Sequence, residues 1–310
     1  RGRIRFVFPI GGEMMTTPIA PAMFTEEDGV LIGPWREPRN EAADQRGSIH
    51  DDETARKLGF RGGTVAGSIH LEQFPPSFLR LWGPRWFERG TISAYFRNAT
   101  TDREPVRTFV RIPGEAGDVQ TEVWMADREG RQVLEGTASV GEAAGPTRLA
   151  QLLASQRTGG DVRILGHLTP GAELPPVPTR LPMEAGEQRM RVITEPLPWY
   201  AGPSPWGGPI ATPALVVRAM RPVEQGMDLR RHRAVGLFGA IELRFLAGPV
   251  FLGREYQVGG RLLAIGETPK SEFAWYESVL FEPESGREVA AMLMMLRFMK
   301  ASSPLWQEAS

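Results

Sequence analysis

Each half of the chain shows a glycine-rich turn, then an apolar segment, then four short runs of β type. The apolar segments, residues 65–74 and 210–220, are expected to be helices, and the second repeats apolar residues at the spacing of one helix face. Proline lacks the amide donor, so Pro75 and Pro76 must end or kink the first helix. The runs predicted as strands are 92–97, 106–112, 120–126 and 133–140, then 240–246, 255–265, 272–281 and 289–298.

An internal repeat relates the two halves. Three pairs of similar segments occur in the same order: 61–66 with 206–211, 90–96 with 239–245, and 130–133 with 286–289. The first pair reads Arg-Gly-Gly-Thr-Val-Ala and Trp-Gly-Gly-Pro-Ile-Ala. Glycine-rich turns that resemble one another by chance are the alternative, but three ordered matches favour two copies of one module.

The predicted fold class is α+β, with two modules that each wrap an antiparallel sheet around one helix. We expect the first module at residues 1–143, a connector at 144–182 and the second module at 183–310. The connector contains a short helix at 147–156 and a proline-rich run at 170–182 that cannot form a central strand. Alternatively, this run packs as part of the second module.

Composition excludes several classes of function. Among 310 residues, 36 basic and 37 acidic side chains give a net charge of −1, which argues against nucleic-acid binding. The chain has no cysteine, so disulfides, zinc–thiolate sites and a cysteine nucleophile are excluded. Its four histidines lack the spacing of a helical metal site, and we expect no metal.

No apolar stretch is long enough to span a bilayer, so we expect no membrane insertion. The first ten residues are too charged for a secretory signal, and the expected location is the cytoplasm.

One stretch of the first half combines a histidine, a short helical run and a glycine-rich turn. It reads Ile-His-Asp-Asp-Glu-Thr-Ala-Arg-Lys-Leu-Gly-Phe over 49–60, then Gly-Thr-Val-Ala-Gly-Ser over 63–68. This stretch resembles the MaoC-like family of R-specific enoyl-CoA hydratases and dehydratases. The family has an Asp-x-Asn-Pro-x-His string, a Gly-Phe pair and an Ile-Ala-His-Gly entry to its central helix. The resemblance implies a double hotdog fold and reversible hydration of a 2-enoyl thioester.

The resemblance carries some residues over and not others. His50 matches the family's catalytic histidine, but Gln45 stands at the place of its aspartate. Asp44, one residue earlier, is our expected partner for His50 if the loop absorbs one residue. In the second copy Glu195 stands opposite His50, and Thr212-Pro213 stands opposite Gly67-Ser68. The first copy is therefore expected to carry the chemistry.

Hydration needs a base for water and donors for the thioester oxygen. A histidine with a pKa near 6.5 suits the first task. The resemblance and the helix N-terminus together assign the oxyanion donor to the amide of Gly67 or Ser68, with Gly63 and His70 as further substrate-binding residues. Alternatively, these glycines only permit close packing, and His70 is a satisfied half-buried histidine.

The expected activity is a hydro-lyase reaction on a thioester of coenzyme A or an acyl carrier protein. No cofactor is expected, because coenzyme A belongs to the substrate. Three alternatives remain: a non-catalytic protein that binds an acyl group or a partner subunit, a specialised dehydratase or isomerase on another substrate, and a thioesterase. Two modules in one chain predict a monomer or a homodimer.

Overall fold

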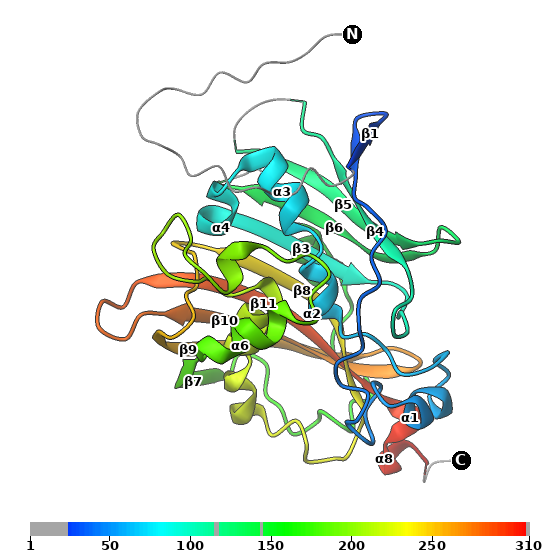
Figure 1. Cartoon of the computed structure of the whole chain (residues 1–310). Helices are drawn as coiled ribbons and strands as arrows, with labels where there is room; N and C mark the ends of the chain where they lie inside the picture. The colour runs from blue at the N-terminus through cyan, green and yellow to red at the C-terminus, as the bar shows by residue number, and fades with distance from the viewer. Residues whose placement is uncertain (1–23, 115–117, 143–144, 308–310) are drawn as a thin grey trace, which may run out of the picture.

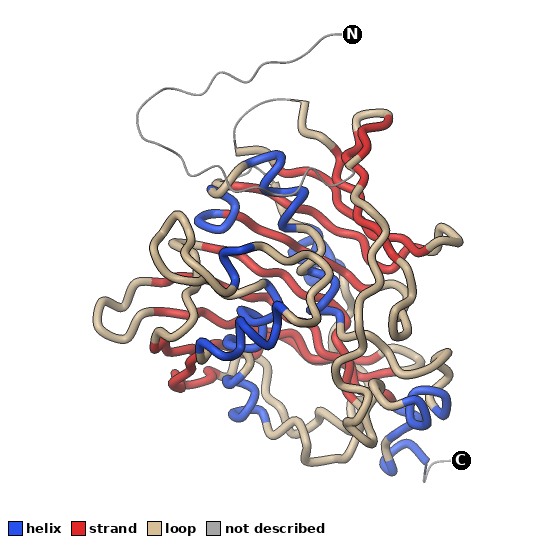
Figure 2. The backbone as a smooth tube through the Cα atoms, in the orientation of Figure 1, coloured by secondary structure: helices blue, strands red, loops and turns tan. Residues whose placement is uncertain are grey.

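The computed structural model describes residues 24–114, 118–142 and 145–307, which form a single antiparallel sheet of eleven strands with helices packed on it. The strands are β1 (Thr25–Glu27), β2 (Val30–Ile32), β3 (Gly90–Phe96), β4 (Val106–Arg111), β5 (Gln120–Asp127), β6 (Gln132–Val140), β7 (Glu173–Arg180), β8 (Gly236–Phe245), β9 (Glu255–Glu267), β10 (Ser271–Phe281) and β11 (Glu288–Met299). Figure 2 shows them running side by side through the molecule.

The helices are short. They are α1 (Asp52–Lys57), α2 (Gly67–Leu71), α3 (Pro75–Trp82), α4 (Arg85–Arg89), α5 (Arg148–Ser155), α6 (Met183–Met190), α7 (Pro213–Met220) and α8 (Pro304–Gln307), with 3-10 turns η1 (Pro198–Tyr200), η2 (Pro222–Met227) and η3 (Lys300–Ser302). In Figure 1, α2, α3, α4 and α6 lie on the viewer's side of the sheet.

The strand order joins two repeated halves through one seam. The sheet runs β1-β2-β4-β5-β6-β3-β8-β11-β10-β9-β7, and every strand pair is antiparallel. The seam is β3 against β8, from Thr91 opposite Arg244 to Tyr95 opposite Ala240. These strands contain the second pair of repeated segments, 90–96 and 239–245, so the repeat found in the sequence includes the place where the halves meet.

The two central helices, α2 and α7, differ in length, and the positions of their prolines explain the difference. In the first half α2 ends at Leu71, and Pro75 and Pro76 open a new helix, α3. Proline is tolerated in a first helical turn because no amide hydrogen is needed there. In the second half α7 continues to Met220 and is capped by Thr212, whose side chain accepts from the Leu215 amide.

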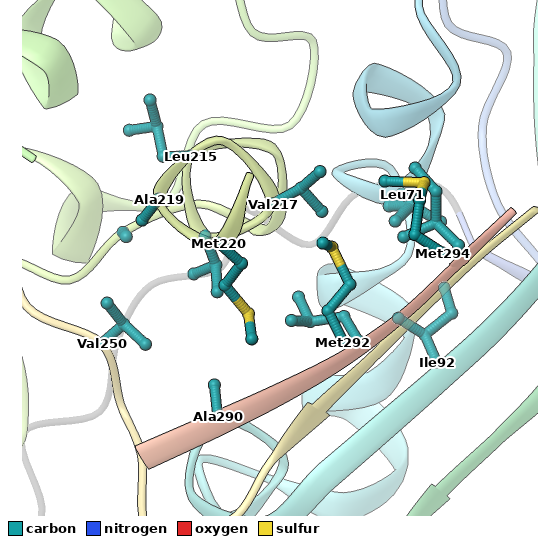
Figure 3. Packing of buried hydrophobic residues seen from close by; sticks show 14 of the residues in the cluster. Leu71, Ile92, Leu215, Val217, Ala219, Met220, Val250, Ala290, Met292 and Met294 are labelled. Atoms are coloured by element: carbon teal, nitrogen blue, oxygen red, sulfur yellow. The ribbon is translucent and has the colours of Figure 1, made fainter. Parts of the chain in front are cut away.

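The main core lies between the central helices and the sheet. Figure 3 shows Met292 and Met294 reaching from β11 toward α7 and toward Leu71 of α2. Both methionines are buried, as expected of flexible apolar side chains that fill the gap between two helices and a sheet. The aromatic residues after α2 also belong to this core; Phe74, Phe78, Trp86 and Phe87 are completely buried.

A smaller core covers the opposite face of the sheet. Leu149 of α5 packs there with Phe273 and Trp275 of β10 and with Met295 of β11. Helix α5 begins at the expected place, because the side chain of Thr147 accepts a hydrogen bond from the Ala150 amide.

The region expected to be a connector supplies an edge strand. Strand β7 pairs with β9 at the end of the sheet, and its register breaks between Leu174 and Val177, where two prolines stand. An edge position suits prolines, because their missing amides need no partner on the open side. Residues 173–180 of this run therefore pair with a strand of the second half. The expected boundary at 143–144 lies outside the described residues.

No helix among the described residues is long and apolar enough to cross a membrane. The first ten residues, on which we based the expectation of no secretory signal, lie outside the described part of the chain.

Candidate active site

A cavity of about 1270 Å³ opens where the N-terminus of α2 meets the second half. This volume exceeds the roughly 300–1,000 Å³ of ordinary small-molecule sites, so a long ligand fits. The first half contributes His50, Phe60, Val65, Gly67 and Phe96, among others, and the second contributes Arg221, Glu224, Phe238, Arg297 and Phe298, among others. The cavity is therefore built by both halves.

His50 is half-buried in the lining, with one ring nitrogen fixed. Its Nδ1 lies 2.7 Å from the carbonyl oxygen of Thr64. A carbonyl can only accept, so Nδ1 carries the proton and Nε2 presents a lone pair. Nε2 has no hydrogen-bond partner in the described part of the chain. The ring is thus held in the tautomer that a general base requires.

Hydrogen bonds from segments before and after α1 hold the backbone around His50. The Thr64 amide donates to the Ile49 carbonyl at 2.9 Å, and Asn40 Nδ2 donates to the His50 carbonyl at 2.7 Å. Asp51 then caps α1, because its carboxylate accepts from the amides of Thr54 and Gly47 at 2.9 and 2.7 Å. These bonds hold the loop on both sides of the histidine.

The N-terminus of α2 presents free amides near the same cavity. Among the described residues, neither the Gly67 nor the Ser68 amide has a hydrogen-bond partner, as is normal for the first turn of a helix. Gly67 lines the cavity and Ser68 does not. A Cβ at Gly67 would lie 2.6 Å from the Phe96 ring, so this glycine also permits close packing. Both interpretations of Gly67 thus have support.

Gly63 has a different role from the one expected. Its amide donates to Asp52 Oδ1 at 2.7 Å and so is not free for a substrate. A Cβ there would lie 2.2 Å from the His50 carbonyl oxygen. Gly63 does not line the cavity, and its position supports a packing role beneath His50.

Asp44 does not join His50. Its side chain is exposed and does not line the cavity, although the next residues, Gln45 to Ser48, do. The loop makes a tight turn there, in which the Arg46 amide donates to the Asp44 carbonyl at 2.9 Å. The structure therefore gives no support to Asp44 as the partner of His50.

His70 is buried with both ring nitrogens engaged. Nε2 lies 2.9 Å from Thr100 Oγ1, and Nδ1 lies 3.3 Å from Gln73 Nε2. Burial lowers the pKa of His70 to about 4, so the ring is neutral at neutral pH. Although it borders the cavity, this arrangement favours a satisfied structural histidine over a substrate-binding one.

Glu224 is a cavity residue that the sequence analysis missed. It is the only carboxylate that lines the cavity among the described residues. Arg221 holds both of its oxygens, at 2.6 and 2.7 Å, and the Tyr276 hydroxyl donates to one of them at 2.6 Å. The sequence feature that could have indicated Glu224 is its spacing of three residues from Arg221, just after the second central helix.

The corresponding place in the second half is filled by side chains. Glu195, the counterpart of His50, is buried and forms an ion pair with Arg36. Thr212, at the N-terminus of α7, donates to Glu72, which also accepts from Arg189 Nε at 2.7 Å. None of these residues lines the large cavity.

One group of three carboxylates in the described residues could in principle hold a metal ion: Glu104, Asp127 and Glu129. It lies outside the cavity, and Arg131 already forms ion pairs with all three. These ion pairs account for the cluster without a metal.

Comparison with known proteins gives a likeness of structure alone, since no family model and no curated protein matches the sequence. A protein from Chloroflexus aurantiacus assigned to the MaoC domain dehydratases is 12% identical, with a TM-score of 0.59 over 90% of this chain and 98% of that one. A MaoC-like dehydratase is 16% identical, with a TM-score of 0.51 over 91% and 99%.

A third similar structure is a conserved hypothetical protein of Mycobacterium tuberculosis, described as having a double hotdog fold. It is 13% identical, with a TM-score of 0.52 over 86% of this chain and 92% of that chain. All three likenesses extend over both halves of the sheet. The chain therefore has the double hotdog fold of MaoC-like proteins.

Proposed function

We propose that the protein is a hydro-lyase that adds water reversibly to a 2-enoyl thioester. The observation that carries the proposal is that His50, with no partner for its Nε2 among the described residues, lines the same cavity as Gly67, whose amide also has none. A base and an oxyanion donor at one cavity are what this addition requires.

The base step uses the tautomer of His50. Nε2 takes a proton from water as the water oxygen bonds to the β-carbon of the enoyl group. The resulting imidazolium is stabilised by the Thr64 carbonyl, which accepts from Nδ1. The same proton then passes from Nε2 to the α-carbon, so that water is added and the histidine is restored.

The oxyanion step uses the start of α2. As water adds, negative charge moves to the thioester oxygen. The Gly67 amide is an unpartnered donor in a first helical turn, where the helix dipole also favours an anion. Removal of one such donor typically costs about 2.7–4 kcal/mol of transition-state stabilisation.

The lining supports an acyl thioester as the ligand. Phe60, Phe96, Phe238 and Phe298 give the cavity apolar walls for an acyl group, and its volume leaves room for a carrier arm. We infer a thioester of coenzyme A or of an acyl carrier protein, with the carrier as part of the substrate and no separate cofactor.

Among the described residues no carboxylate is hydrogen-bonded to the His50 ring, and this favours a second candidate, an acyl-binding protein without turnover. Asp44 lies away from the cavity, and the oxygens of Glu224 are held by Arg221 and Tyr276. Turnover and binding are separable by experiment.

The test mixes the protein with crotonyl-CoA and follows enone absorbance and free thiol together. We expect enone loss without thiol release, and His50→Ala should lower that rate at least about 100-fold. His232→Ala is the matched control, since His232 does not line the cavity. Thiol release would indicate a thioesterase, and binding without either signal would support the second candidate. Full activity in the His50→Ala variant would remove the catalytic assignment.

A further inference from the structure

Arg297, on β11, is a half-buried arginine without an acidic partner within 4 Å in residues 24–114, 118–142 and 145–307. Its Nη2 donates to the Tyr95 hydroxyl at 2.8 Å, and its guanidinium lies 5.4 Å from the centre of that ring. Its Nε is buried and bonds to nothing described. Arginine offers five N–H donors, and protein groups use one of them here.

The sheet is shaped to hold this side chain. Arg297 reaches over β8 to Tyr95 on β3, and so crosses the seam between the halves. Gly239 of β8 lies beneath it. A Cβ at that position would come within 2.9 Å of Arg297 Nε and 3.1 Å of Arg297 Cγ. A glycine at this place leaves room for the guanidinium.

The charged side chains that line the cavity are positive on balance, although the whole chain carries a net charge of −1. Arg46, Arg230 and Lys270 also line the cavity and have no ion-pair partner among the described residues. The lining carboxylate, Glu224, is already paired with Arg221. A cleft lined by one sign of charge concentrates ligands of the opposite sign.

We propose that Arg297 and Tyr95 form a subsite for an anionic oxygen group of the ligand, a phosphate or a carboxylate. The free N–H groups of Arg297 suit two parallel bonds to such a group. Tyr95 accepts from Arg297, so its own hydroxyl hydrogen is free to donate to the same anion. Protein groups give the half-buried Arg297 no counter-ion among the described residues, and a bound anion would supply one.

The subsite deepens the proposed function, because Arg297 and His50 line one cavity. Two sources could supply the anion. A phosphate would belong to the carrier end of a coenzyme A thioester, whereas a carboxylate would belong to the far end of the acyl group. Pantetheine thioesters separate these sources because they lack the phosphates.

Arg107 provides a matched control on the same sheet. It also has a buried Nε without a partner, and its guanidinium lies 4.6 and 5.0 Å from the centres of the Trp35 and Phe109 rings. Unlike Arg297, it does not line the cavity. If the loss of any unpaired arginine stacked on an aromatic ring changed binding, Arg297→Gln and Arg107→Gln would show the same change.

The experiment measures dissociation constants by calorimetry for saturated thioesters, which cannot be hydrated: butyryl-CoA, butyryl-pantetheine and the pantetheine monothioester of glutaric acid. In the wild type, at least one anion-bearing probe should bind about tenfold or more tighter than butyryl-pantetheine. Arg297→Gln should abolish that preference, Arg297→Lys should restore part of it, and Arg107→Gln should retain it. Loss for butyryl-CoA identifies a phosphate, and loss for the diacid thioester identifies a carboxylate.

Equal affinity of the wild-type chain for all three probes would overturn the subsite even if Arg297→Gln failed to fold. Unchanged preference in a folded Arg297→Gln variant would overturn it as well. Both readouts are of binding, so they are independent of the hydration assay. If Arg297→Gln removes the preference for an anion-bearing probe but the protein hydrates no thioester, the subsite is supported and the hydro-lyase proposal is refuted. If the protein hydrates thioesters but shows no such preference, the hydro-lyase proposal is supported and the subsite is refuted.

Discussion

At the scale of single residues, the site depends on how closely the backbone approaches His50. Asn40 donates to the His50 carbonyl, Thr64 accepts from the ring, and Gly63 lies under the same carbonyl with no room for a side chain. The direction of the imidazole is thus set by main-chain packing more than by another side chain.

Gly63→Ala should therefore lower hydration activity at least about tenfold, because a Cβ 2.2 Å from a backbone oxygen forces the histidine loop to move. We expect a parallel loss of about 1–3 kcal/mol in the free energy of unfolding. Thermal unfolding and the crotonyl-CoA assay measure the two effects. Gly114→Ala is the control, since nothing lies within 4 Å of its Cβ position. Normal activity in Gly63→Ala would show that the loop tolerates displacement.

The sequence predicted that His50 belongs to the site, but it did not predict which other side chains line the cavity. A histidine followed by a short helix and a glycine-rich turn is a local pattern, and the structure places it at the cavity. Asp44 could not be placed, because one extra loop residue decides where a carboxylate points. Glu224 and Arg297 come from the other half, and local spacing contains no information about contacts between distant segments.

At the scale of elements, the residue that caps α5, Thr147, also forms a tertiary contact with β8. Thr147 accepts from the Ala150 amide at 3.2 Å and donates to Glu242 Oε2 at 2.5 Å. Glu242 is a buried carboxylate on β8, so the cap residue fixes the helix to the seam strand.

Thr147→Ala should destabilise the protein by about 1–2 kcal/mol, because it removes a helix cap and leaves Glu242 with one fewer donor. Thr147→Ser should keep most of that stability, since the hydroxyl remains. Chemical denaturation of the two variants gives the comparison. Equal stability of the alanine and serine variants would mean that neither bond contributes.

Strand positions were largely predictable, because apolar runs between turn residues indicate half-buried strands. The eight predicted strands correspond to β3–β6 and β8–β11 within a few residues. Strand β7 was missed because its prolines are incompatible with a central strand, and only its edge position makes them acceptable. Likewise, α2 is shorter than predicted because the chain turns before the prolines of α3.

At the scale of the whole molecule, ion pairs tie the first half of the chain to the second half. Arg36 pairs with Glu195, and Glu41 and Glu72 both pair with Arg189. Tyr200 lies buried nearby with a hydroxyl that has no partner among the described residues.

This arrangement makes stability depend on pH. Burial raises the pKa of Glu195 to about 7, above its ordinary value of 4.5, although Arg36 opposes the shift. In the unfolded chain the carboxyl loses its proton near pH 4.5, whereas the folded chain keeps it until about pH 7. Stability should therefore fall as pH rises from about 4.5 to 7, by up to about 3 kcal/mol.

Glu195→Gln should flatten that part of the pH profile, because glutamine does not ionise. Thermal unfolding between pH 5 and pH 8 measures the slope. Glu284→Gln, at an exposed residue, should keep the wild-type slope. A wild-type slope in Glu195→Gln would assign the pH dependence to another group.

The filled counterpart of the His50 site has an evolutionary consequence. When two identical subunits associate, any substitution appears at both symmetry-related sites, so neither can be given up alone. Fusion into one polypeptide removes that constraint. Here one site has an open cavity, while the corresponding place in the other half holds Glu195, paired with Arg36, and Thr212, bonded to Glu72. Further substitutions at the His50 site therefore leave the corresponding place in the second half unchanged.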